Sequence, residues 1–198
     1  MTQLRARSLP PTVPTVDNMD DYEISLALHR SKTRDLIESW SHTPAVLVDR
    51  HLEVLHSNPL ARALSESFWD GANLARFTFL HPDVTRTADC WEDTAEQVAA
   101  MLRGSLEQHE QDRAFLAIVG ELSAKSWDFS DAWAKNEQPR SSGVATFLDT
   151  EVGEVTLGYH LTRVPENYDD TLILFGPADA ESKMSLERLA AAVGSVGA

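Results

Sequence analysis

The sequence is short of cysteine, of basic residues and of long apolar runs, and each shortage excludes a class of protein. Its single cysteine, Cys90, excludes an internal disulfide. Lys and Arg together number 17 against 31 Asp and Glu, and the net charge of -14 repels the phosphates of nucleic acid. No run is long and apolar enough for a membrane span or a signal peptide. We therefore expect a cytoplasmic chain that binds neither nucleic acid directly nor a membrane.

The sequence also lacks the spacings that identify catalytic and metal sites. His51 and His56 have no cysteine or carboxylate partner at metal-ligand spacing, which favours surface histidines. Ser141 and Ser142 lack the strand-turn-helix setting of a nucleophile elbow, and glycine-rich phosphate loops are absent. Cys90 fits a small buried hydrophobe better than a reactive thiol. We therefore expect no catalytic residue, no metal site, no cofactor and no enzymatic activity.

The clearest pattern in the chain is a pair of strands between Gly153 and Phe175. Apolar residues alternate with polar residues or glycine through positions 154–161, which is the period of a strand with one buried face. A turn-like segment at 164–170 follows, and residues 171–175 are apolar throughout. Because the connection is short, the two strands are expected to form an antiparallel hairpin.

The remaining elements complete an α+β pattern. Strands are expected at 45–48, 52–56 and 143–148, and helices at 20–40, 60–68, 84–106, 112–124, 130–136 and 182–193. The segment 71–81 is ambiguous, with apolar residues at 74, 77, 79 and 80. Two strands, several helices, three strands and a helix is the order of a PAS-like domain. It predicts a five-stranded antiparallel sheet, with helices inserted between strands 2 and 3 and packed on one face.

The chain divides into three parts. Residues 1–19 are rich in Pro, Ser and Thr and are expected to form a disordered linker arm. A helix capped by Asp20 or Asp21 occupies 20–43, and the PAS-like domain occupies 44–193. A helix-turn-helix domain needs several helices and a basic face, which one helix cannot supply. We expect that this chain lacks that domain, and that its helix packs on the core or on a second copy.

A set of short stretches between about Ala45 and Ala192 carries a family resemblance through its order and spacing. The stretches are Leu52–Leu64, Asn73–Pro82, Asp89–Glu92, Val98–Arg103, Val119–Ser123, Trp127–Phe129 with Trp133–Ala134, and Val152–Leu157. Together they resemble the ligand-binding domain of MmyB-like transcription regulators. The resemblance implies a PAS-like sensor that holds a fatty acid or a similar apolar ligand and forms a homodimer. In that family the sensor usually follows a DNA-binding helix-turn-helix domain.

Aromatic residues dominate the candidate site. They lie on apolar faces that must meet, so they either fill a core or line a pocket between the sheet and the helices. Arg76 and the Tyr159 hydroxyl are the polar groups best suited to a ligand. The predicted ligand-binding residues are Arg76, Trp91, Phe115, Val119, Trp133, Phe147, Leu157 and Tyr159.

Two functions follow from these alternatives, and a third is weaker. If the aromatic residues line a pocket, the chain is the fatty-acid-sensing domain of a bacterial transcription regulator. If they fill the core, it is a protein-protein interaction module that acts through the N-terminal helix. An enzyme on a similar fold lacks support, because no acid-base pair with a clear role is present.

Overall fold

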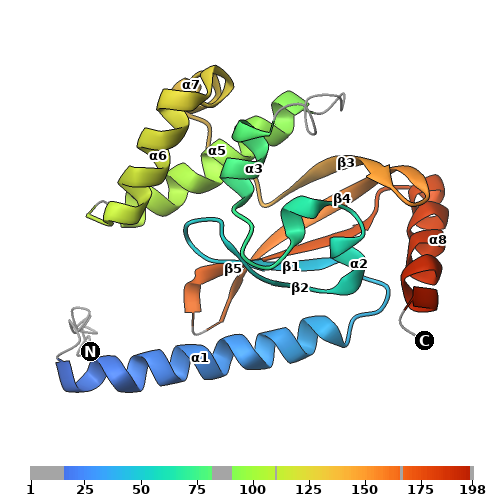
Figure 1. Cartoon of the computed structure of the whole chain (residues 1–198), viewed down its shortest axis with the longest axis horizontal. Coiled ribbons are helices and arrows are strands. Elements are labelled where there is room, and N and C mark those ends of the chain that lie inside the picture. The colour runs from blue at the N-terminus through green and yellow to red at the C-terminus, as the bar shows by residue number, and fades with distance from the viewer. Residues whose placement is uncertain (1–15, 82–90, 110, 166, 197–198) are drawn as a thin grey trace, which may run out of the picture.

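The computed structural model describes residues 16–81, 91–109, 111–165 and 167–196 (Figure 1). Most of the predicted arm, the start of the helix predicted at 84–106, and Cys90 lie outside these described residues. What is described forms an α+β fold in which a sheet separates one long helix from a group of shorter helices.

The sheet confirms the predicted five antiparallel strands. They are β1 (Ala45–Val48), β2 (Val54–Ser57), β3 (Ser142–Thr150), β4 (Gly153–Val164) and β5 (Asn167–Pro177). The strand order is β2-β1-β5-β4-β3, and each neighbouring pair is antiparallel. The first and last strands of the sequence, β1 and β5, are therefore neighbours at its centre, with Ala45 opposite Leu174.

The strand ends differ from the sequence prediction at two turns. The predicted strand at 52–56 begins at Val54, because Leu52 adopts the left-handed backbone conformation with φ 64° and its N–H is donated to the carbonyl of Asp49. The segment predicted as a turn at 164–170 is mostly strand. There β4 continues to Val164, which pairs directly with Asn167 of β5.

The helices lie before, within and after the set of strands. The helical segments are α1 (Val16–Glu38), α2 (Pro59–Arg62), the 3-10 helix η1 (Glu66–Phe68), α3 (Leu74–Leu80), α5 (Trp91–Gln108), α6 (Arg113–Lys125), α7 (Trp127–Ala134) and α8 (Ala180–Val196). All from α2 to α7 are inserted between β2 and β3, as predicted.

Helix boundaries follow the capping residues. The first helix begins at Val16, so Asp20 and Asp21 lie inside α1 and the prediction that one of them caps it was wrong. The helix predicted at 60–68 is broken in two, because the Ser65 side chain accepts a hydrogen bond from the Ser67 N–H and starts η1. Ser126 caps α7 in the same way, so this helix begins before the predicted Ser130.

The two faces of the sheet bury different residues. On β1, Val46 and Val48 point into the main core with the inserted helices and α8, whereas Ala45 and Leu47 point into a smaller core beneath α1. This is the expected consequence of side chains that alternate between faces along a strand. The inserted helices confirm the predicted packing on one face, and α1 crosses the other (Figure 1).

Gly143 on β3 and Tyr159 on β4 form a close cross-strand pair. A Cβ atom at position 143 would lie 2.6 Å from the Tyr159 hydroxyl oxygen. The tyrosine ring therefore lies directly over the glycine. Any residue with a Cβ atom at position 143 would force the ring to move. This contact fixes the ring on the face of the sheet that meets the inserted helices.

Replacing Gly143 with Ala is expected to lower the free energy of unfolding by about 1–2 kcal/mol, because the new methyl group displaces the Tyr159 ring. Gly120 is the matched control, since a Cβ there meets nothing within 4 Å. Gly120→Ala should instead stabilise the protein by about 0.5–1 kcal/mol through helix propensity. Urea denaturation followed by circular dichroism measures both. Equal stabilisation by the two substitutions would show that the ring does not depend on Gly143.

Candidate functional site

A cavity of about 690 Å³ lies between the sheet and the inserted helices. The segment 142–149 of β3 lines one wall along its length, and residues 62–68 together with side chains of α3 and α5 line the others. The helices α5, α6 and α7 pack mainly on one another and on α3, rather than flat on the strands. Because they do not close down on β3 and β4, space for a ligand of ordinary small-molecule size remains.

Three of the predicted ligand-binding residues line this cavity: Trp91, Phe147 and Tyr159. Phe147 packs against Phe68 and Phe175 with ring centroids 5.8 and 5.4 Å away, and these two rings also line the cavity. These three phenylalanine rings therefore belong both to the hydrophobic core and to the wall of the cavity.

The other five predicted residues lie elsewhere. Phe115 and Leu157 are fully buried in the main core, and Val119 is half-buried beside it. The Trp133 ring is covered by the Arg103 guanidinium, 4.2 Å from its centroid. Arg76 donates to Glu121 at 2.8 Å on the outside of the helices, where hydrogen bonds from Lys125 and from this arginine lower the pKa of Glu121 to about 2.

Polar residues that sequence reasoning did not select line the cavity near the start of β3. The side chain of Gln97, only 6% of which is exposed, accepts from the Arg140 N–H at 3.0 Å and donates to the Arg140 carbonyl at 2.8 Å. Arg140, Gln97 and Tyr159 all line the cavity. Burial raises the pKa of Tyr159 above its ordinary value, although the nearby Arg140 guanidinium acts in the opposite direction. The hydroxyl therefore keeps its proton near neutral pH and remains a hydrogen-bond donor.

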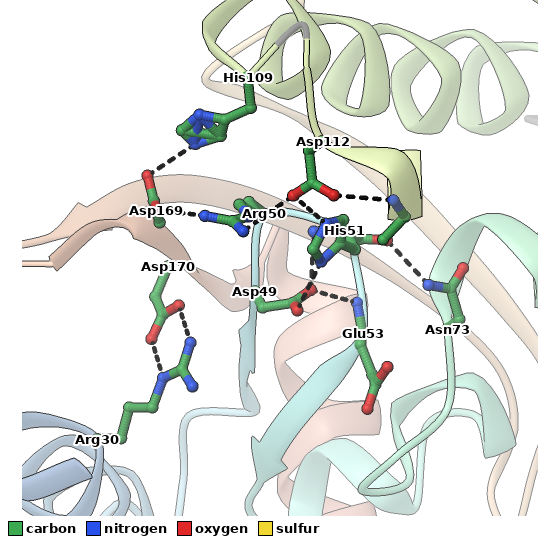
Figure 2. Close-up of polar contacts among 11 residues, drawn as sticks. Arg30, Asp49, Arg50, His51, Glu53, Asn73, His109, Asp112, Asp169 and Asp170 are labelled. Carbon is green, nitrogen blue, oxygen red and sulfur yellow. Dashed lines mark hydrogen bonds and ion pairs between the residues drawn. The ribbon is translucent and has the colours of Figure 1, made fainter. Parts of the chain in front are cut away.

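A charged network joins the β1–β2 loop to the α5–α6 loop and to β5 (Figure 2). His51, in the loop between β1 and β2, contacts Asp49 at 3.2 Å and Asp112 at 3.0 Å through its two ring nitrogens. Asp112 also accepts from the Ala114 N–H at the start of α6. Burial opposes ionisation of Asp112, but the Ala114 N–H, His51 and Arg50 together hold its pKa below the ordinary value.

Two consecutive aspartates of β5 extend this network to both faces of the sheet (Figure 2). Asp169 contacts Arg50 at 3.1 Å and His109, beside the α5–α6 loop, at 3.0 Å. Asp170 is 1% exposed and accepts two hydrogen bonds of 2.8 Å from Arg30 of α1. Since neighbouring side chains on a strand point to opposite faces, this pair connects the inserted helices to α1.

The side chains of the cavity are suited to binding a small molecule, and those of the charged network link separate elements of the fold. Within the described ranges, no group of three or more His, Cys, Asp or Glu side chains is arranged to hold a metal ion. The same part of the chain contains no helix long and apolar enough to cross a membrane. The mostly apolar cavity with a few polar groups near one end is instead the arrangement of a small-molecule binding site.

The strand order, the inserted helices and the cavity together define a PAS-like ligand-binding domain. The sequence comparison names its family. A family model described as the MmyB-like transcription regulator ligand binding domain matches residues 29–189, and the chain belongs to this family. No curated protein matches the chain at a significant level. It is thus a regulatory ligand-binding domain of the type found in transcription regulators.

Replacing Arg30 with Met is expected to lower the free energy of unfolding by about 2 kcal/mol, because it leaves the buried Asp170 carboxylate without this partner. Lys32→Met, at an exposed position of the same helix, is the control and should change stability by less than about 0.5 kcal/mol. Adding Asp170→Leu to Arg30→Met should recover part of the loss. If Arg30→Met behaved like the control in urea denaturation, Asp170 would not depend on α1.

Proposed function

We propose that this domain senses a fatty-acid-like small molecule and passes the signal to the rest of a bacterial transcription regulator through the geometry of a homodimer. The observation that carries the proposal is the cavity of about 690 Å³ beside β3, with its wall of aromatic and aliphatic side chains. A filled core, which is the basis of the alternative interaction module, would leave no such space.

The energetics of burial favour an acyl chain as the ligand. Each methylene removed from water contributes about 0.8 kcal/mol, so ten of them supply about 8 kcal/mol. Part of this energy offsets the cost of immobilising the ligand. A longer chain is therefore expected to bind more tightly until it exceeds the length of the cavity.

Fatty acids of about eight to sixteen carbons, held below their micelle concentrations, are expected to stabilise the protein. At a hundredfold excess over the dissociation constant, the stabilisation is about 2.7 kcal/mol, or roughly 5–10 °C in melting temperature. Ala145→Phe should abolish the shift, because Ala145 lines the cavity. His160→Phe, at an exposed position of the neighbouring strand β4 and outside the cavity lining, should retain it.

The absence of a thermal shift with every chain length would contradict the fatty-acid proposal. The interaction module would then become the better account, because it needs no ligand. Loss of the shift in both phenylalanine variants would mean that the sheet was disturbed as a whole. Differential scanning calorimetry of the free variants tests that possibility, since both should melt near the wild-type temperature.

The assembly part of the proposal rests on α1. Ile24 and Leu28, one turn apart on this helix, are 67% and 53% exposed, which is unusual for large apolar residues. Two-fold symmetric dimers are the commonest way in which a chain covers such a surface with a second copy. The domain is therefore proposed to dimerise with a contribution from α1. The expected cytoplasmic location and the lack of direct DNA contact by this chain belong to the same proposal.

Replacing both Ile24 and Leu28 with Glu is expected to shift the protein from dimer to monomer in sedimentation velocity, because it places charge in the apolar contact. Lys32→Glu changes the net charge by the same amount on the same helix and should leave the dimer intact. A wild-type monomer at all concentrations, or an unchanged dimer in the double variant, would remove α1 from the assembly.

A further inference from the structure

We propose that Arg140 is the residue that selects an acidic head group, with the Tyr159 hydroxyl as a second donor and the buried Gln97 as the positioning residue. This inference rests on the proposed function, and it assigns an orientation to the ligand. The head group lies near the start of β3, and the tail extends along the strand toward Phe147.

The main chain of Arg140 is held in place by the buried side chain of Gln97. Both amide atoms of Gln97 are used on the backbone N–H and carbonyl of this one residue, 43 positions further along the chain. Because both polar atoms of the buried Gln97 amide are hydrogen-bonded to one residue far along the chain, they fix the position of that residue's backbone. The backbone is thereby fixed, whereas the Arg140 side chain is half-exposed and reaches the Gln97 amide oxygen only through a long contact of 3.5 Å from Nε.

Two cationic side chains, Arg62 and Arg140, belong to the described lining of the cavity. Arg62 is the less exposed of the two, and its guanidinium donates a hydrogen bond to the Ser57 carbonyl and lies 4.0 Å from Asp70. The Arg140 guanidinium instead contacts Asp93 and Gln97: Nη2 donates to the Asp93 carbonyl at 3.1 Å, Nη1 lies 3.4 Å from the nearest Asp93 carboxylate oxygen, and Nε lies 3.5 Å from the Gln97 amide oxygen. Asp93 is 66% exposed, and such a surface ion pair contributes little energy. A ligand carboxylate can therefore replace it.

The donors of Arg140 and Tyr159 are chemically complementary to a carboxylate. A guanidinium presents a planar set of donors that matches a carboxylate, and a protonated phenol adds another donor. Gly143 allows the tyrosine ring to lie beside the start of β3, where its hydroxyl and Arg140 are near each other. From Gly143 to Phe147 the strand advances about 14 Å along the cavity wall. That direction leads from the polar groups to the aromatic cluster of Phe68, Phe147 and Phe175.

The test compares dodecanoic acid with 1-dodecanol, which share a chain length and differ in head group. We expect isothermal titration calorimetry to show that wild-type protein binds the acid about 10- to 100-fold more tightly than the alcohol. Arg140→Gln should remove this preference by weakening the acid alone, because the backbone bonds to Gln97 remain. Asp93→Asn is the opposing variant and should tighten the acid a few-fold, since it removes the competing carboxylate.

The outcomes separate this inference from the proposed function. Equal affinity of wild-type protein for acid and alcohol, or an unchanged preference in Arg140→Gln, would overturn the head-group assignment and leave the acyl pocket standing. Equal weakening of both ligands in Arg140→Gln would also overturn it, because Arg140 would then act through the fold. If neither compound bound to wild-type protein, the proposed function would fail and this inference with it.

Discussion

The pairing of β1 with β5 is the interaction on which the rest of the structure depends. It joins the β1–β2 hairpin to the β3–β4–β5 meander, two pieces that are separated in sequence by the inserted helices. A two-stranded hairpin is marginally stable in water, so β1 and β2 need this contact to become part of a sheet. The pairing also places Val46 and Ile173 together on one face and Leu47 and Leu172 on the other, which creates both cores at once.

The cavity follows from the same topology. Because the inserted helices leave and return at opposite halves of the sheet, they form a separate layer with its own contacts, chiefly α5 with α7 and α3. The Phe68–Phe147–Phe175 cluster fills part of the space between the two layers. The remainder is bounded by β3, where Gly143 leaves room for the Tyr159 ring.

Consecutive residues of β5 provide a direct connection between the loops near the inserted helices and α1. Asp169 contacts the loops beside the inserted helices, and Asp170 contacts Arg30 on the opposite face. The arrangement thus links the α5–α6 loop region to α1 through two neighbouring residues of one strand.

The candidate site was predictable only in part. Trp91, Phe147 and Tyr159 were found because large aromatic side chains on apolar faces must lie in or near the core. The same reasoning selected Phe115 and Leu157, which are fully buried outside the cavity lining. Periodicity identifies the buried face of an element, but it does not distinguish a residue in contact with another side chain from one that borders an empty space.

The sequence by itself determined the strands, most of the helices, their order and the family. These depend on local periodicity, on capping residues and on short motifs, all of which are written in neighbouring positions. Only the tertiary structure decided that Gln97 holds Arg140, that Asp170 meets Arg30 and that the cavity lies along β3. Each of these depends on groups far apart in the chain. The distances between these groups are set by how the sheet and the helices pack together. A local pattern of residues carries no information about such distances.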